Sequence, residues 1–465
     1  MLGLIILGTI FALATGFGIK VYLDRTQSEY RITTAEFAIA TAVILLIVAP
    51  TVSYVGTRVA ITNQVTFNEN WGGWETEAIW TKQQTHRDGP HRWGYDCDPY
   101  QVYVVDRSAY TDDKGRYHPE EGHYETRYHD CPYATEEWTF TIRTTLGEYE
   151  IADRNLPTNP NQYRWRSYKH VPEDLPSGVP QFWRDAKDRL DKSDPGPVTA
   201  RRQYENYILA SQSTILQRFS DSIDRYKKDK LLPALSTRPV HDFYFADRVF
   251  FVGTHPAGDW QGTLNRFDAA LGSSLQGDLY LVIVDAARIT DPDNYAGALM
   301  AYWQSKEFGK DALSKNGIVV VVGTTDGKTI SWARAGTGMP VGNEAMLIDI
   351  QNAMPGKQLD AEALFGHPTP SISTTANQVK VTIRHSQGVL EQILWGPHFY
   401  QRVSMSSKSG KGVGYEYLKR EIQPTSGQQV LILLCTVLFS GIVWGVCVAV
   451  GVPAYRSARG RFNSL

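Results

Sequence analysis

The chain has 465 residues, with 47 Lys and Arg against 49 Asp and Glu and a formal net charge of −2. This length allows two or three domains and a sizeable core. The near-neutral balance gives no reason to expect nucleic acid as a partner, because nucleic-acid-binding proteins carry an excess of basic residues.

Three apolar segments are long enough to cross a bilayer ~30 Å thick, which takes ~20 helical residues. They lie within residues 1–23, 35–56 and 428–453. Pro50 in the second segment is compatible with a membrane helix, because neighbouring helices can satisfy the carbonyl that it frees. The first segment lacks the basic start of a signal peptide, and Lys20 follows its apolar run instead, so we expect a retained helix.

Basic residues beside these segments predict their orientation. The link 24–34 and the tail 454–465 are both rich in basic side chains: Lys20, Arg25 and Arg31 lie in or beside the first, and Arg456, Arg459 and Arg461 in the second. The positive-inside rule puts both in the cytoplasm and residues 57–429 outside it. We therefore predict a multi-pass membrane protein, surrounded by membrane lipid, with a large domain on the extracytoplasmic or periplasmic side.

The region 57–170 has the pattern of an aromatic-rich β structure. Segments such as "QVYVVDRSAY" and "EEWTFTIRTTLGEYEIA" alternate aromatic or β-branched residues with polar ones. Many of the 12 Trp and 25 Tyr of the chain lie here. These side chains suit sheets and partner-binding faces, because they bury large areas and keep a polar group.

Two cysteines of this region, Cys97 and Cys131, are the only ones in the large domain. A single pair in an oxidising compartment favours a disulfide. The alternative is a zinc site that combines both cysteines with two of the five histidines of the region: His86, His91, His118, His123 and His129. The disulfide is favoured, because there is no Cys-x-x-Cys pair and no helical His-x-x-x-His pair.

Residues 171–240 are predicted to form a helical connector. Apolar residues recur at helical spacing along the stretch 198–232, at Tyr204, Ile208, Ile215, Phe219, Ile223 and Tyr226. A helix of this length would span ~45–50 Å. It is a candidate stalk or oligomer seam, and a homo-oligomer is one expectation that follows.

The pattern changes in residues 241–375 to alternating strands and helices. Expected strands are 248–253, 278–286, 317–323 and 328–336, and expected helices are 258–276, 291–309 and 342–354. The third strand and the fourth are joined by the hairpin turn "TTDG". Continuous apolar strands indicate burial on both faces, so we expect helices on both sides of the sheet.

Within this region, "DNYAGALMAYWQ", "NGIVVVVG" and "KTISWARAGTGM" follow one another in order. Their markers are Asp293, Tyr295, Ala296, Trp303, Asn316, Gly317, Gly336 and Gly338. Residues 247–375 thereby resemble the TPM-domain family, which is named for a thylakoid acid phosphatase, a photosystem II repair protein and an auxiliary protein of acetylcholine receptors. The resemblance implies an α/β/α sandwich, often with a divalent cation such as Ca²⁺ held by loop carboxylates.

Four aspartates are the candidate ligands of such a cation. Asp285 ends a strand, Asp291 and Asp293 begin a helix, and Asp326 lies in a turn. Ligands gather at strand ends in open α/β sheets, and carboxylate oxygens suit a hard cation. The same residues also fit ordinary roles as helix caps and turn formers, so both interpretations are open.

The remaining segment, 376–427, is predicted to return through β and loop structure to the third span. No catalytic residues are assigned, because P-loop, Gly-x-Ser-x-Gly and His-Glu-x-x-His patterns are all absent. The predicted fold class is therefore an α+β membrane protein with three membrane helices, an aromatic-rich β region, a long helix and a TPM-like sandwich.

Three functions are consistent with this organisation. We expect first a binding, scaffold or auxiliary subunit that docks other membrane or envelope proteins. The first alternative is an extracytoplasmic phosphatase that depends on Ca²⁺ or Mg²⁺, with Asp285, Asp293 and Asp326 holding the metal. The second alternative is a structural membrane protein of a viral or envelope assembly.

The disulfide predicts the outcome of a thiol titration on the denatured, non-reduced chain. Of the four cysteines, only Cys435 and Cys447, which lie in the third span, should react. Two further reactive thiols, from Cys97 and Cys131, would contradict the disulfide. Reduction before the titration should raise the count from two to four and serves as the control.

Overall fold

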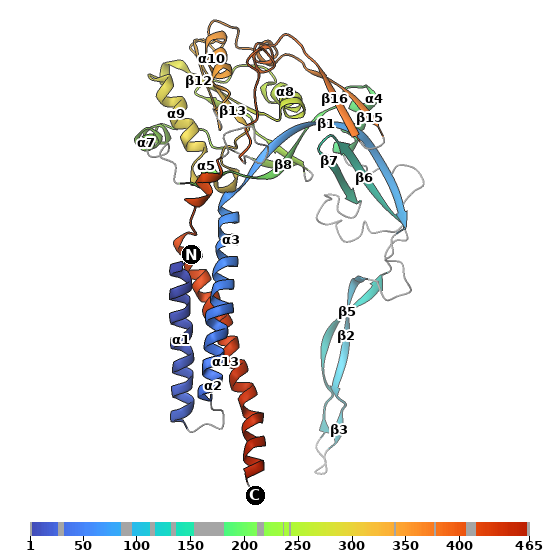
Figure 1. The fold of residues 1–465 in the computed structure, drawn as a ribbon. Helices are drawn as coiled ribbons and strands as arrows, with labels where there is room; N and C mark the ends of the chain where they lie inside the picture. The colour runs from blue at the N-terminus through green and yellow to red at the C-terminus, as the bar shows by residue number, and fades with distance from the viewer. Residues whose placement is uncertain are drawn as a thin grey trace.

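The computed structural model describes residues 2–26, 32–84, 95–111, 117–131, 136–152, 181–211, 218–235, 237–240, 243–338, 341–375, 378–405 and 415–462. The described chain mixes helices and sheets. Figure 1 shows a bundle of long helices with a part above it in which helices flank a sheet, and the long strand β1 (Thr66–Gln84) leads from the bundle past this part to a second group of strands.

Three helices are long and apolar enough to cross a membrane, which fits the membrane protein predicted from the sequence. The first is α1 (Leu2–Arg25). The second is continuous through α2 (Thr34–Val43), the π-helix η1 (Ile44–Val48) and α3 (Ala49–Val65). The third is α13 (Ser426–Phe462).

Two boundaries of these helices differ from the sequence prediction. Residues 57–65 were expected in the β region, and this was wrong, because α3 continues to Val65 and the chain becomes extended only at Thr66. No proline or glycine follows Gly56 in this stretch, so nothing ends the helix there. Likewise, α13 continues past residue 453 to Phe462, so the predicted tail is largely helical.

Small residues on α1 allow the first and third membrane helices to pack closely. A Cβ added at Gly8 would lie 3.0 Å from Thr436, and one at Gly16 would lie 2.2 Å from the ring of Trp444. The Trp444 indole N–H donates to the carbonyl oxygen of Ala12 at 3.2 Å, and both residues are buried. Residues 8, 12 and 16 thus form a small-residue stripe that receives α13.

A four-stranded mixed sheet forms the centre of the α/β part, in the order β11-β12-β13-β14. The first three strands are parallel, and β14 is antiparallel to β13. These strands are β11 (Val249–Val252), β12 (Asp278–Asp285), β13 (Gly317–Thr324) and β14 (Trp332–Thr337). The four strands expected from the sequence in this region are confirmed.

Helices cover both faces of this sheet. One face packs with Leu264 and Phe267 of α8 (Trp260–Leu275) and with Ile350 of α10 (Glu344–Ala353). The other packs with Leu299 and Trp303 of α9 (Pro292–Trp303), and with Tyr226 of α7 (Ser220–Lys228). Burial on both faces explains why β12 and β13 are continuous apolar runs.

A second four-stranded sheet has the order β7-β6-β1-β8. It consists of β1 (Thr66–Gln84), β6 (Glu136–Thr144), β7 (Gly147–Ala152) and β8 (Pro197–Glu205), all antiparallel. The long helix expected over 198–232 was therefore wrong. Its first residues form β8, which pairs with β1 from Phe67 with Tyr204 to Gly73 with Val198.

The physical reason lies in a distant partner. Apolar residues of 198–232 keep helical spacing, but β8 gains a ladder of hydrogen bonds with a strand more than 100 residues earlier in the chain. The spacing of apolar residues within 198–232 gives no information about this pairing with β1. The helices within the described part of the stretch are short: they include α5 (Tyr207–Ala210) and α7.

Short strands and helices complete the fold. Two-stranded sheets pair β9 (Thr237–Val240) with β10 (Phe243–Ala246), β15 (Thr369–Thr375) with β16 (Gln378–Arg384), β2 (Tyr95–Arg107) with β5 (Glu121–Cys131), and β3 (Tyr110–Thr111) with β4 (Tyr117–His118). The shorter helices are α4 (Gln181–Asp191), η4 (Ala286–Arg288), η5 (Lys306–Asp311), α11 (Ala361–Phe365), α12 (Val389–Leu394) and η6 (Glu416–Arg420). Leu390 and Leu394 of α12 pack into the same core as α8, so part of the segment 376–427 belongs to the α/β part.

The Gly16–Trp444 contact predicts that even a methyl group is harmful at this position. Gly16→Ala should lower the free energy of unfolding by roughly 1–3 kcal/mol, the usual cost of overpacking. This loss should appear as a lower melting temperature of the full chain in mild detergent. Gly18→Ala is the matched control, because no heavy atom lies within 4 Å of a Cβ built there. Equal melting temperatures for the two variants would contradict the close packing of α1 on α13.

Candidate functional site

The polar junction at which the second long helix becomes a strand is the best-defined candidate site. We call it the α3–β1 joint: residues 63–71 with the side chains that contact them. The Lys310 ammonium on η5 donates to Asn63 Oδ1 at 3.1 Å. Asn68 donates to Asp311 Oδ1 at 2.6 Å, and Arg201 of β8 pairs with the same carboxylate at 3.2 Å. These contacts connect the end of α3, the start of β1 and η5.

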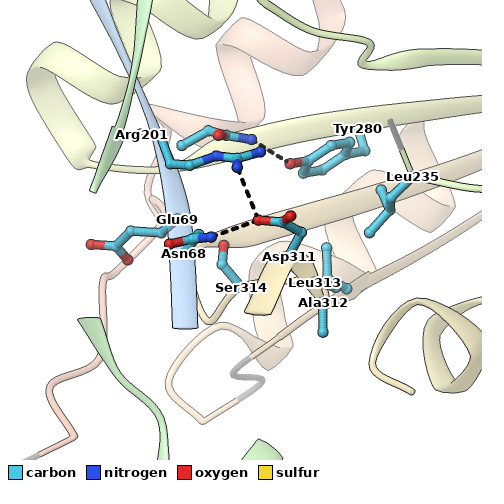
Figure 2. A pocket seen from close by; sticks show the side chains of 10 residues that line it. Asn68, Glu69, Arg201, Leu235, Tyr280, Asp311, Ala312, Leu313 and Ser314 are labelled. Carbon is cyan, nitrogen blue, oxygen red and sulfur yellow. Dashed lines mark hydrogen bonds and ion pairs between the residues drawn. The ribbon is translucent and has the colours of Figure 1, made fainter. Parts of the chain in front are cut away.

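Figure 2 shows the small cavity beside these contacts. Its wall includes Asn68, Glu69, Arg201, Tyr280, Asp311 and Ser314, and its volume is about 20 Å³. This is room for about one water molecule, whereas small-molecule sites measure ~300–1,000 Å³. The cavity therefore does not admit a substrate-sized ligand.

A buried carboxylate anchors the opposite face of β1. Glu69 is almost fully buried and accepts hydrogen bonds from Arg402 at 2.5 Å and from the Trp71 indole N–H at 2.8 Å. The guanidinium groups of Arg202 and Arg402 each lie over the Trp71 ring, 4.6 Å from its centroid. Cation–π contact and ion pairing together hold the segment around Arg402 against β1.

Lys315 lies beside the joint, where it contacts Tyr204 of β8. Its backbone N–H donates to the Tyr204 hydroxyl at 3.1 Å, and its ammonium lies 5.6 Å from the centre of the same ring. Burial, together with the nearby charge of Arg402, lowers the pKa of Lys315 to about 8. The opposing effect of Glu69 is smaller.

A buried ionic cluster lies where the two larger sheets meet. Arg248, Asp268 and Asp278 are all fully buried. The Arg248 guanidinium donates to Asp278 Oδ1 at 2.8 Å and lies 2.9 Å from Asp268 Oδ2. It also donates to Thr199 Oγ1 of β8 at 3.1 Å, so the cluster joins the second sheet to the α/β part.

The cluster holds two carboxyl groups against one guanidinium. Asp278 also accepts a 2.6 Å hydrogen bond from Tyr280, and Asp268 accepts one from the Leu279 N–H at 2.9 Å. Burial away from water raises the pKa of Asp268 to about 8, against the opposing effect of Arg248. Two ionised carboxylates beside one guanidinium would leave an excess of buried negative charge, which favours the protonated form of Asp268.

The four aspartates predicted as metal ligands occupy the roles of caps, turns and ion pairs. Asp285 accepts from the Ala287 N–H and Asp291 from the Asn294 N–H. Asp293 pairs with Arg334, and this pairing lowers the pKa of Asp293. Asp326 accepts from the N–H groups of residues 328 and 329, and these bonds lower its pKa to about 2.

The four side chains do not form one ligand set with each other. Within the described ranges, no group of three or more His, Cys, Asp or Glu side chains could hold a metal ion. The geometry therefore gives no support to the Ca²⁺ prediction, which stays a prediction.

The remaining markers of the TPM resemblance have structural contacts. The Tyr295 hydroxyl donates to Leu231 O at 2.6 Å, and the Asn316 amide donates to Asn70 O at 3.1 Å. Gly317 opens β13, Gly336 lies in β14, and a Cβ at Gly338 would lie 2.0 Å from the carbonyl oxygen of Ser314. Asn316 and Gly338 thus lie next to the α3–β1 joint.

Cys97 and Cys131 lie on the paired strands β2 and β5. The register places Cys97 opposite His129 and Cys131 opposite Tyr95, so the two cysteines are diagonal neighbours. Their side chains, and those of His86, His91 and His129, lie outside the described residues. No disulfide is seen among the side chains that the structure describes, and the Cys97–Cys131 pair stays a prediction.

Comparisons with known proteins assign no family. No family model matches the chain, and no curated protein and no solved structure gives a significant match. The TPM resemblance therefore rests on the quoted sequence markers.

Sequence reasoning missed the residues that form the joint and the cluster: Glu69, Arg248, Asp268, Asp278, Lys315 and Arg402. One signal was present in "NWGGW", residues 70–74. Glycines inside a strand indicate close approach of another backbone, and a Cβ at Gly72 would lie 2.2 Å from the carbonyl oxygen of Asp268. The contacts of this region can fix the orientation of the folded part relative to the bundle of long helices.

The raised pKa of Asp268 predicts a pH dependence of stability. Between about 4 and about 8, the folded chain binds this proton and the unfolded chain does not, so the stability contributed by this group is lost as the pH rises. The melting temperature of the unchanged chain should therefore fall as the pH rises through this window. In Asp268→Asn it should fall less steeply, because the variant has no carboxyl group at position 268 to titrate.

Asp259→Asn is the matched control, because Asp259 is the exposed N-cap of the same helix and asparagine caps equally well. Its pH profile should follow that of the unchanged chain. Identical pH profiles for Asp268→Asn and the unchanged chain would contradict proton binding in the buried cluster.

Proposed function

We propose that the protein is a membrane-anchored binding or scaffold protein, acting as an auxiliary subunit of a membrane protein assembly. In this proposal the three long helices span the membrane and the α/β part is a TPM-like module outside the cytoplasm. The observation that carries the binding role is the exposed aromatic face of one β-ribbon.

The proposed orientation rests on charge and on the direction of the helices. Both α1 and α13 run away from the folded part, so their C-terminal ends lie at the far end of the bundle (Figure 1). These ends carry Arg25 and Arg456. Basic residues at one end favour the cytoplasmic side, which supports an extracytoplasmic location for the folded part.

The ribbon formed by β2 and β5 exposes large aromatic side chains. Tyr103 and Tyr124 lie opposite each other, with ring centres 5.1 Å apart in an edge-to-face arrangement. They are 43% and 71% exposed, and Tyr128, on the same face of β5, is 46% exposed. Tyrosine is enriched at binding hot spots, and a two-stranded ribbon is only marginally stable by itself in water. A partner that covers this face would stabilise it.

The charge of the ribbon indicates the kind of partner. Residues 95–131 contain nine acidic and four basic residues. On the opposite face from Tyr103 and Tyr124, His123 pairs with Asp106 at 2.8 Å, and this pairing raises the pKa of His123. An acidic aromatic ribbon favours a partner protein with a basic rim around an apolar centre.

The contacts of the joint and of the buried cluster support this proposal, because they stiffen the connection between the helix bundle and the folded part. A scaffold that positions a partner relative to the membrane needs a stiff connection between the two. Contacts from η5, β8 and the segment around Arg402 all converge on the first six residues of β1. The ribbon strand β2 is the next described element of the chain after β1.

Replacing Tyr103, Tyr124 and Tyr128 together with serine tests the proposal. Truncation of a hot-spot residue costs ~2 kcal/mol or more, so the recovery of partner proteins from native membranes in mild detergent should fall at least about tenfold. Tyr417→Ser is the control, because Tyr417 is 58% exposed on η6, away from the ribbon. A chain purified from its own membranes without partners, or partner recovery that the triple variant leaves unchanged, would contradict the proposed role.

A further inference from the structure

An apolar groove of about 720 Å³ runs along the outside of the helix bundle between α3 and α13. Figure 1 shows these two helices side by side below the folded part. The wall is formed by residues such as Val52, Val55 and Val59 from one helix and Leu431, Cys435 and Phe439 from the other. The helices touch at Gly56, where an added Cβ would lie 2.8 Å from Ile432.

The groove covers the depth of one membrane leaflet. Its upper end is polar, with Asn63 and Gln428, and its lower end is at Ile47 and Val443. Arg58, the only charged residue between Phe37 and Val65, marks the level of the lipid headgroups. From Arg58 to Ile47 the helix rises ~16 Å, about half of a ~30 Å hydrocarbon core.

This depth decides between two occupants. A partner transmembrane helix would need a seam through both leaflets, whereas the groove ends near the middle of the membrane. A lipid chain needs one leaflet only. The π-helix η1 lies at the lower end, and its residues Ile47 and Val48 form the floor. Single π-helical turns inside α-helices are frequent at functional sites.

A basic residue lies at the upper end of the groove. Lys310 is exposed, and its ammonium is 3.1 Å from Asn63 Oδ1, at the polar end. The neighbouring carboxylate of Asp311 does not neutralise this charge, because it is paired with Arg201 and Asn68. A cation above an apolar groove complements a ligand with a negative head and a hydrocarbon tail.

We propose that the groove binds one anionic phospholipid, with an acyl chain between α3 and α13 and its phosphate at Lys310 and Asn63. This inference rests on the membrane embedding in the proposed function, but it is independent of the aromatic ribbon. The lipid would bridge the bundle and η5, and would therefore strengthen the α3–β1 joint from the membrane side.

Native mass spectrometry of the full chain in detergent, with phosphatidylglycerol and phosphatidylcholine added in equal amounts, tests the proposal. The unchanged chain should retain one phosphatidylglycerol, preferred at least about fivefold over phosphatidylcholine. Lys310→Glu should abolish this preference. Val55→Trp should reduce retention of both lipids, because Val55 is 50% exposed in the groove wall and the larger side chain fills it.

Two matched controls separate the groove from general effects. Lys306→Glu makes the same charge change on η5, and Leu434→Trp adds the same bulk to α13 at a 61% exposed position outside the groove. Both should retain lipid like the unchanged chain. Alkaline extraction of the membranes checks that each variant remains embedded.

Three results would overturn the proposal: no lipid preference in the unchanged chain, an unchanged preference in Lys310→Glu, or unchanged retention in Val55→Trp. Cross-linking of a cysteine at position 55 to a second protein in native membranes would also overturn it, because a helix would then occupy the groove. The triple tyrosine variant of the ribbon should keep its lipid. Failure of the lipid site and failure of partner docking are therefore seen separately.

Discussion

The buried contact of Arg248 with Asp268 and Asp278 is the interaction on which the arrangement of the folded part depends. A guanidinium with no exposed surface needs its charge matched by nearby carboxylates and acceptors, and here the partners come from α8, β8 and β12. Removal of one partner from such a cluster typically costs ~3–5 kcal/mol, because it leaves an uncompensated charge. The two larger sheets therefore have one favourable relative position. That position sets where β1 enters the folded part.

From this constraint follows a continuous physical connection between the folded part and the bundle of long helices. The second long, apolar helix becomes β1 without a loop between them, and the first residues of β1 are held on several sides by η5, β8 and Arg402. Lys310 belongs to this joint and also lies at the polar end of the groove between α3 and α13. The proposed lipid site and the joint therefore share Lys310. The proposed scaffold role is the function that such a connection serves.

Features that depend on neighbouring residues were predictable from the sequence. The strands β11, β12 and β13 are continuous apolar runs, and the N-caps Asp259 and Asp291 precede their helices directly. Tyr204 and Ile208 show the limit of such patterns. Their spacing is helical, yet Tyr204 lies in β8 opposite Phe67, because pairing with a distant strand outweighs a local preference. The candidate site was missed for the same reason: Glu69 and Arg402 are 333 positions apart in the chain.

By itself, the sequence determined that three helices are long and apolar enough for a membrane and that a sheet covered by helices on both faces lies between the second and third. Both are consequences of hydrophobic runs, which act through composition over ~5–20 consecutive residues. Only the tertiary structure decided which partners the polar residues contact. It assigned the four aspartates to caps, a turn and an ion pair, and it brought Glu69, Lys315 and Arg402 together. The physical reason is that the charge and the pKa of a polar side chain depend on its spatial neighbours, which sequence spacing does not specify.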